Sequence, residues 1–271
     1  MERNKKFRFR RSQLSIPYAL FLILFVLLPL ILILYYAFTD ANGQFCYFDN
    51  FVNFFADNSK LSTLIISIVI GAINTIICLL IGYPIAYLLA NKKYNKSKIM
   101  ILLFIMPMWI NFVLRTAATR DLLGALGITG GNMPYLAVMI GMVYNYLPFT
   151  ILPLYTTMLK MDKSVIEASS DLGARPFKQF TKAIIPMSMP GIVSAATMVF
   201  MPTLSSYVIS DILSEYNVVL FGSYIDLYFN QADWNFGSFM ALIMLLLIGV
   251  SVLISRKFSN EDETGGRASI W

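Results

Sequence analysis

Long stretches without a charged side chain alternate with short charged segments along the chain. A helix that crosses the apolar core of a bilayer needs about 20 consecutive apolar residues. The stretches that lack Asp, Glu, Lys and Arg are 12–39, 61–91, 99–114, 122–159, 183–210 and 234–255. Five of them reach the required length, and a span at 99–114 must include flanking residues at one end. The pattern predicts an all-α, polytopic membrane protein with six transmembrane helices.

Two of these stretches need a closer reading. The apolar part of the first, 16–38, follows a basic segment, as in a secretory signal peptide. It exceeds the roughly 7–15 apolar residues of a signal, and no A-x-A cleavage site follows, so we expect a retained signal-anchor helix. The fourth stretch has room for one helix, centred on 135–158, after a glycine-rich loop.

The basic residues indicate the orientation. With a cytoplasmic N-terminus, the inside segments are 1–15, 91–98, 160–187 and 256–271, and they hold 18 Lys and Arg. The outside segments hold only Lys60, Arg115 and Arg120. Because basic residues concentrate on the cytoplasmic side of membrane proteins, we expect both termini in the cytoplasm. This arrangement leaves a net charge of +11 inside and −5 outside.

Composition excludes several classes of protein. Hydrophobic residues make up 58% of the 271 residues and charged residues 13%, against roughly 45–50% and 25% in soluble domains. A soluble enzyme, a disordered chain and a nucleic-acid binder are therefore excluded. The concentration of Lys and Arg in the cytoplasmic segments accounts for the net charge of +6. The chain has no His, which excludes histidine triads and metal sites. Cys46 and Cys78 stand far apart in unlike surroundings, so we expect no disulfide.

Prolines and polar residues interrupt the apolar stretches. An interior proline removes a backbone hydrogen bond and bends a helix. The prolines within or near the ends of the stretches are Pro29, Pro84, Pro107, Pro148, Pro153 and Pro202. The polar residues at depth include Asn74, Asn145, Ser205 and Ser206. We interpret these as contacts between helices, with the lining of a substrate path as the alternative.

The segment 160–187 is predicted to form two short helices that project into the cytoplasm. Ser164 and Glu167 have the spacing of a capping box, which starts a helix. Gly173 suits the left-handed position that ends one, and Pro176 the first turn of the next. Pro186 marks the start of the fifth span. An apolar stripe is expected at Val165, Ile166, Ser169 and Leu172.

Two roles are open for this amphipathic segment. It can dock into a groove on another protein. It can also lie on the lipid surface, where basic side chains suit anionic lipid. The basic residues concerned are Lys163, Arg175, Lys178 and Lys182.

The same segment resembles the EAA signature of permease subunits of binding-protein-dependent ABC importers, whose pattern is E-A-A-x3-G-x9-I-x-L-P. Glu167, Ala168, Gly173 and Pro186 match it. Small or apolar residues replace the others, at Ser169, Ala183 and Ile185. The resemblance implies that the loop is a coupling helix that fits a cleft in a cytoplasmic ATPase. The implied contact residues are Glu167, Ala168, Ser169, Leu172, Gly173, Ala174 and Pro186.

Further segments resemble polyamine-type permeases, in particular the first of two permeases in a spermidine/putrescine importer. They are 106–111 with 114–116, 200–202 with 207–209, and 233–238. The resemblance implies the type I ABC importer permease fold. It divides the chain into 1–60 (N-tail, first helix and outer loop), 61–255 (permease domain) and 256–271 (cytoplasmic tail). Permeases for iron, thiamine, sulfate and phosphonates share this layout and remain alternatives.

The resemblance also implies partners: an ABC ATPase dimer, a second homologous permease and an external substrate-binding protein, in the plasma membrane of a bacterium. The chain has no G-x4-G-K-[ST] phosphate loop. We therefore expect it not to be an enzyme, to need no cofactor or metal, and to rely on ATP hydrolysis by the partner. The alternative is an ion-coupled secondary transporter, which usually needs acids within the membrane, and the six stretches contain none.

A polyamine cargo suggests candidates for the substrate path. Aromatic faces bind alkylammonium groups by cation–π contact, and an acidic outer surface attracts a polycation. The candidates are Trp109, Tyr144, Asn145 and Tyr207, with Asp211 and Glu215 at the outer mouth. For each aromatic residue, helix packing or an interfacial belt is the alternative. Arg115 is expected to be an outer anchor that reaches water or pairs with Asp121.

Overall fold

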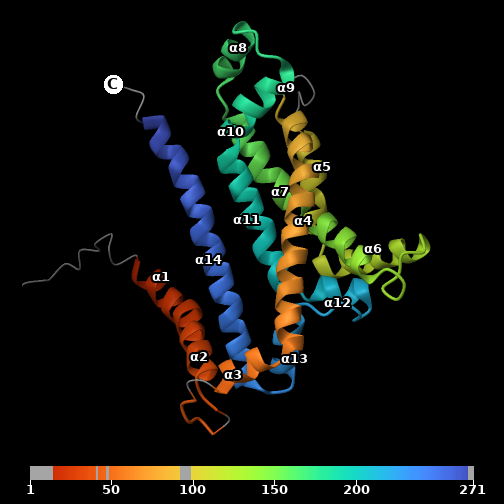
Figure 1. Cartoon of the computed structure of the whole chain (residues 1–271), viewed down its shortest axis with the longest axis vertical. Helices are drawn as coiled ribbons and strands as arrows, with labels where there is room; N and C mark the ends of the chain where they lie inside the picture. The colour runs from red at the N-terminus through yellow and green to blue at the C-terminus, as the bar shows by residue number, and fades with distance from the viewer. Residues whose placement is uncertain (1–14, 41, 47–48, 92–98, 268–271) are drawn as a thin grey trace, which may run out of the picture.

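A computed structural model describes residues 15–40, 42–46, 49–91 and 99–267 (Figure 1). In these residues the chain is helical, and the β-structure is an isolated bridge between Thr39 and Phe45. The fold class predicted from the charge-free stretches, all-α, is confirmed for this part of the chain.

The N-terminal part contains the first long apolar helix and the start of the second. Helices α1 (Ser15–Leu22) and α2 (Leu28–Ala37) are joined by the π-helical turn η2 (Ile23–Leu27). In the most apolar window of this span, no residue is buried inside the chain. Helix α3 (Asp49–Ala56) leads into α4 (Asn58–Ala90), where the Asp57 side chain accepts a hydrogen bond from the Ser59 N–H at 2.9 Å.

Three helices form the central bundle: α4, α7 (Pro134–Leu159) and α11 (Met189–Ser205). The bounds of α7 confirm the helix predicted around 135–158. Small residues let these helices approach closely, as at Gly82, where a Cβ would lie 2.8 Å from Cγ2 of Thr150 on α7. Helices α4, α7 and α11 all continue through their interior prolines.

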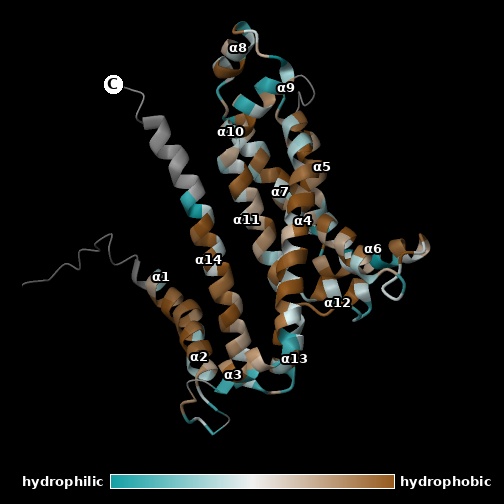
Figure 2. Cartoon of the chain, viewed as in Figure 1, coloured by the Kyte–Doolittle hydropathy of each residue, from teal (hydrophilic) through white to brown (hydrophobic). Residues whose placement is uncertain are grey.

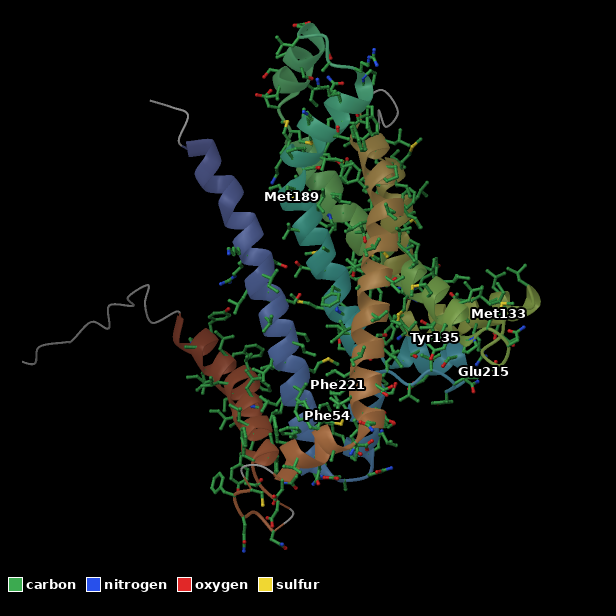
Figure 3. The ribbon with its side chains drawn as sticks, in the orientation of Figure 1. Phe54, Met133, Tyr135, Met189, Glu215 and Phe221 are labelled. Carbon is green, nitrogen blue, oxygen red and sulfur yellow. The ribbon has the colours of Figure 1, made fainter. Side chains whose placement is uncertain are left out.

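The last helix, α14 (Trp234–Arg267), packs against α2, α11 and α13 (Phe221–Asn230). It begins where the charge-free stretch predicts, but it continues 12 residues past position 255, into the predicted tail. An aromatic cluster fills the end of the molecule near α3 and α13. The rings of Phe54 and Phe221 meet edge to face there, with centroids 6.1 Å apart (Figure 3).

Two of the predicted spans are broken. Helix α5 (Ile99–Ile105) continues into the 3-10 turn η3 (Met106–Trp109), and α6 (Phe112–Ala125) then departs at 96°. Helix α9 (Pro176–Gln179), the π-helical turn η4 (Phe180–Ile184) and α10 (Ile185–Met187) meet α11 at 66°. Among the described residues four helices can cross a bilayer, or six if each bent pair is one span.

The two ends of the bundle contain different polar segments, with hydrophobic helices between them (Figure 2). Helices α8 (Lys163–Asp171) and α9 lie at one end and α3 and α13 at the other, with hydrophobic lengths of α4, α11 and α14 between them. The basic segment 160–187 and the acidic residues on and around α3 and α13 therefore occupy opposite ends, as the charge distribution predicts. The basic segments 1–14 and 92–98 lie outside the described residues.

Candidate functional site

The loop between α7 and α11 begins with a capped helix. The N-cap of α8 is Asp162, whose Oδ1 accepts a hydrogen bond from the N–H of Ser164 at 2.9 Å. This bond lowers the pKa of the Asp162 carboxyl. The predicted capping box of Ser164 with Glu167 is wrong. Asp162 has the extended backbone that an N-cap requires, whereas Ser164 is already the second residue of the helix.

Gly173 ends α8 as predicted. Its φ is +76°, in the left-handed region that favours glycine. The N–H of Ala174 donates to the carbonyl of Ser169 at 3.1 Å, and the N–H of Gly173 to that of Ser170 at 2.9 Å. This pair of bonds is a Schellman motif. Pro176 occupies the first turn of α9, also as predicted.

Gln179 locks the two short helices together. Its Nε2 lies 2.6 Å from the carbonyl oxygen of Ile166, 2.7 Å from Ser169 Oγ and 2.8 Å from Ser170 Oγ. The serine that replaces the second alanine of the signature is therefore part of the joint between α8 and α9. Sequence reasoning missed Gln179, because its partners lie 9 to 13 positions away and follow no helical spacing.

The predicted apolar stripe of α8 is divided between two environments. Ile166 and Ser169 are partly buried near α9, whereas Leu172 is 88% exposed. Phe177, which the sequence analysis did not single out, is 79% exposed on α9. Leu172 and Phe177 are thus two exposed apolar side chains of the loop, and we use the name "loop tip" for these two residues.

The remaining loop candidates are spread from α8 to α10. Glu167 and Ala168 are exposed on α8, and Pro186 is exposed in α10. Glu167 also lines a cavity of about 220 Å³ with Tyr87 and Met158, near the ends of α4 and α7. The loop therefore projects from the bundle while its base rests on the bundle helices.

The second region is the break in the third span. Asn111 caps α6, since its Oδ1 accepts hydrogen bonds from the N–H groups of Val113 at 2.9 Å and Leu114 at 3.4 Å. Pro107 occupies the preceding 3-10 turn. The charge-free stretch 99–114 therefore does not form one helix, because a strong N-cap follows a tight turn and redirects the chain.

Arg115 is buried at this break, with 8% of its surface exposed. Its Nε donates to Oδ1 of Asn145 at 2.9 Å and its Nη1 to the carbonyl of Pro107 at 2.8 Å. Its guanidinium lies 5.7 Å from the ring centroid of Tyr144. The prediction that Arg115 reaches water or pairs with Asp121 is wrong. The 96° turn directs Arg115 inward, and Asp121 pairs with Arg120 at 2.9 Å instead.

A cavity of about 470 Å³ adjoins the buried arginine. Its lining brings together two of the predicted path residues, Trp109 and Asn145. Trp109 is 79% exposed, and Asn145 is buried. Tyr146 also lines the cavity and donates from its hydroxyl to the carbonyl of Pro202 at 3.3 Å. The sequence analysis missed Tyr146, although it directly follows the candidate Asn145.

The other path candidates lie apart from this lining. The Tyr144 ring already faces the Arg115 guanidinium. Tyr207 precedes α12 (Val208–Ser214), and it is the neighbouring Ile209 that lines the cavity. The predicted path residues therefore do not form one cluster.

The two outer acids differ in environment. Asp211, on α12, is partly buried and accepts a hydrogen bond from the Ser223 hydroxyl at 2.9 Å. Burial raises the pKa of the Asp211 carboxyl, the Ser223 bond opposes this, and the nearby Asp226 raises the pKa further. Glu215 is exposed and directly follows α12 (Figure 3). Its backbone lies close to Gly130, since a Cβ added to Gly130 would be 2.8 Å from the Glu215 backbone nitrogen.

Comparison with solved structures identifies the fold. A bacterial ABC transporter involved in the import of the acidic polysaccharide alginate matches with a TM-score of 0.65 and 16% identity, over 92% of this chain and 94% of that chain. The same kind of transporter, in complex with an alginate pentasaccharide-bound periplasmic protein, gives a TM-score of 0.69 and 13% identity over 92% and 93%. The fold is that of an ABC importer permease. A scan against family models finds no match.

Curated relatives identify the family. The "Spermidine/putrescine transport system permease protein PotB" of Haemophilus influenzae is 31% identical over 284 residues, covering 94% of this chain and 98% of its own length. PotB of Escherichia coli K12 is 31% identical over 253 residues, covering 86% and 92%. A PotB homolog of Mycoplasma pneumoniae is 33% identical over half of each chain. The chain belongs to the PotB family of permeases, which confirms the predicted resemblance and favours it over a secondary transporter.

Proposed function

We propose that this chain is a membrane-spanning permease subunit of an ATP-driven ABC importer that carries spermidine and putrescine into a bacterial cytoplasm. The observation that carries the proposal is its similarity to PotB of H. influenzae, at 31% identity over 94% of the chain. In this proposal each bent helix pair is one span, which gives six spans, and both termini are cytoplasmic. The opposite placement of the basic loop and the acidic segments supports this orientation.

The assembly we propose has a second homologous permease, two ATPase subunits below the membrane and an external substrate-binding protein. The chain has no phosphate loop of its own, so ATP is hydrolysed by the ATPase subunits. The loop between α7 and α11 is the contact with one ATPase. Its tip offers two exposed apolar side chains, Leu172 and Phe177, on a frame held by Gln179. A rigid apolar tip of this kind fits a groove on a protein partner.

Transport in this proposal follows the movement of the loop. ATP binding closes the two ATPases, draws the loops together and opens the central cavity outward. The binding protein then releases its cargo into the cavity. Because α9, η4 and α10 form a continuous run from the loop to α11, movement of the tip is carried into the bundle.

The path of the cargo begins at the acidic outer end, whose predicted net charge of −5 raises the local concentration of a polycation. Trp109 is the most exposed of the aromatic residues that line the cavity and is the candidate for cation–π contact with an alkylammonium group. Asp211, in the first turn of α12, and Glu215, directly after that helix, are the candidates for the outer mouth.

Uptake by the reconstituted complex tests this proposal. Proteoliposomes with all subunits are given labelled spermidine or putrescine, with and without ATP on the ATPase side. We expect ATP-dependent uptake of at least one polyamine that excess unlabelled polyamine abolishes. Thiamine, sulfate, phosphonate and iron serve as competitors. Uptake of one of these solutes, without uptake of either polyamine, contradicts the polyamine assignment and leaves the permease assignment standing.

A further inference from the structure

The guanidinium of Arg115 connects three elements at the break of the third span. It lies on the first turn of α6, bonds the carbonyl of Pro107 in η3 at 2.8 Å, and bonds Asn145 on α7 at 2.9 Å. Asn145 is itself oriented, because its Nδ2 donates to the carbonyl of Gly141 at 2.8 Å. A chain of hydrogen bonds therefore runs from the backbone of α7 to the backbone of the 3-10 turn.

The Pro107 carbonyl needs such a partner. At a break in a membrane helix, carbonyl groups lose their helical donors and must find others within the protein. The N–H of Ile110 reaches Pro107 at 3.3 Å, which is a long bond, and the charged Nη1 of Arg115 supplies the shorter one. Arg115 therefore stabilises the turn in its present shape.

Trp109 is two residues from Pro107 on that same turn. Its side chain is 79% exposed and lines the cavity beside Arg115 and Asn145. We infer that Arg115 is a positioning residue: it holds the turn 106–109 against α7 so that Trp109 faces the cavity and meets the cargo. This inference rests on the proposed function for the role of the cargo, but the placement of Trp109 is independent of it.

The chemistry of the site requires arginine. Its planar fork directs Nε and Nη1 to two acceptors on different elements at once, which a single ammonium group cannot reproduce at the same spacing. Both acceptors are neutral, so neither of these bonds supplies a counter-charge to the guanidinium beside the cavity. Among the described residues that line the cavity there is no carboxylate. A positioning role explains why the positively charged Arg115 lies beside the proposed path of a positively charged cargo.

A matched pair of substitutions separates the positioning role from a charge effect. Arg115→Met keeps the apolar stem and removes both hydrogen bonds. Arg120→Met removes the same charge from the same helix, at an exposed residue paired with Asp121. Arg115→Lys retains the charge and at most one of the two bonds. Asn145→Leu removes the acceptor on α7 and leaves Arg115 in place.

The first readout follows Trp109 directly. The chain has three Trp residues, so Trp234→Phe with Trp271→Phe leaves Trp109 as the single tryptophan of the full chain, which is purified in detergent without its partners for this measurement. We expect Arg115→Met to lower the fluorescence anisotropy of Trp109 and to change its quenching by acrylamide. Asn145→Leu should do the same, Arg115→Lys should be intermediate, and Arg120→Met should match the parent.

The second readout is polyamine uptake in the wild-type tryptophan background. We expect Arg115→Met to raise the KM for spermidine about tenfold, equivalent to about 1.4 kcal/mol, and to change the maximal rate less than twofold. Arg120→Met should leave KM unchanged. If the wild-type complex carries no polyamine, the proposed function fails, and the fluorescence comparison still decides the placement of Trp109.

Three outcomes overturn the inference: wild-type anisotropy in Arg115→Met, equal effects of Arg115→Met and Arg120→Met, or a fall in maximal rate with KM unchanged. If Arg115→Met does not assemble, Arg115→Lys and Asn145→Leu are judged by the same criteria, and parental anisotropy in both overturns the inference.

Discussion

The hydroxyl groups of Tyr83 and Ser188 lie 2.8 Å apart and join α4 to the bend between α10 and α11. Ser188 is buried and also donates to the carbonyl of Ile185 at 2.9 Å. Because a serine hydroxyl has one proton, Tyr83 donates to Ser188. The ring of Tyr83 also meets Phe180 of η4 edge to face, at 5.6 Å between centroids. Contacts of Tyr83 therefore join α4 to η4 and to the bend before α11.

The first prediction tests this joint. Tyr83→Phe removes the hydrogen bond and keeps the ring contact with Phe180. We expect a loss of about 1 kcal/mol in the free energy of unfolding in detergent, and fewer polyamine molecules carried per ATP hydrolysed. Tyr87→Phe is the control, since the Tyr87 ring meets Phe180 at 6.2 Å and retains that contact. Equal effects of the two changes would show that the hydroxyl contact does not couple the loop to α4.

The second prediction concerns the turn at Gly173. An aspartate there must adopt a positive φ, which costs on the order of 1 kcal/mol or more, and it adds a charge beside the loop tip. We expect Gly173→Asp to leave membrane insertion intact, to abolish ATP-driven uptake and to lose the ATPase on co-purification. Gly127 is the matched control, because it has a φ of +79° and open space around it on the α6–α7 loop.

Gly127→Asp introduces the same strain far from the proposed ATPase contact, and it should retain the ATPase. Retention of the ATPase and normal uptake by Gly173→Asp would instead favour the alternative of a helix that lies on the lipid surface.

The third prediction concerns the cap of α8. The Ser164 N–H bond lowers the pKa of Asp162 below its ordinary value of 3.8. The stabilising contribution of the cap is therefore fully present at neutral pH and is lost as the pH falls through the lowered, folded-state pKa. We expect Asp162→Ala to speed hydrogen exchange of the first-turn amides of α8 at pH 7. Asp171→Asn, at the C-terminal end of the same helix, removes a charge that the helix dipole disfavours, and it should not speed exchange.

The fourth prediction concerns the outer acids. Glu215 is exposed, so Glu215→Gln should weaken polycation uptake more at low than at high ionic strength, because salt screens surface attraction. Loss of equal size at both ionic strengths would point to direct contact or a folding fault.

Asp211 should add a pH dependence. Because burial raises its pKa, Asp211 loses its charge at a higher pH than an exposed aspartate does. We expect uptake to decline as the pH falls through this value, and Asp211→Asn, which still accepts the Ser223 hydrogen bond, to flatten that part of the profile. An unchanged profile in Asp211→Asn would exclude its charge from the uptake step.

The fifth prediction concerns topology. Reporters fused after Lys98 or Lys182 should be cytoplasmic, and those after Asn53 or Glu215 external. Accessibility to a membrane-impermeant reagent measures this without transport. A reversed signal at any of the four positions would contradict the six-span arrangement.

Interactions between residues that are close in the sequence were sufficient to predict much of the fold. The length and position of α7, the left-handed Gly173 and the start of α9 at Pro176 follow from interactions within a few residues, and so does the all-α class. The family resemblance was readable for the same reason, because the signature around Glu167 is a short run of neighbouring residues. Even there the cap was misassigned, since Asp162 and Ser164 are both capping residues and only the backbone distinguishes them.

Tertiary structure decided the rest of the candidate site. Whether Arg115 meets water or Pro107 depends on the 96° turn before it, and that turn places it against Asn145, 30 positions later in the chain. Gln179 and Ser169 are likewise joined only because α9 folds back onto α8. Sequence determined which segments are apolar and where helices such as α7 and α9 begin, because those preferences act over one or two turns. The faces that meet are set by packing between distant segments, and in an apolar medium the buried polar groups must find whichever partners that packing provides.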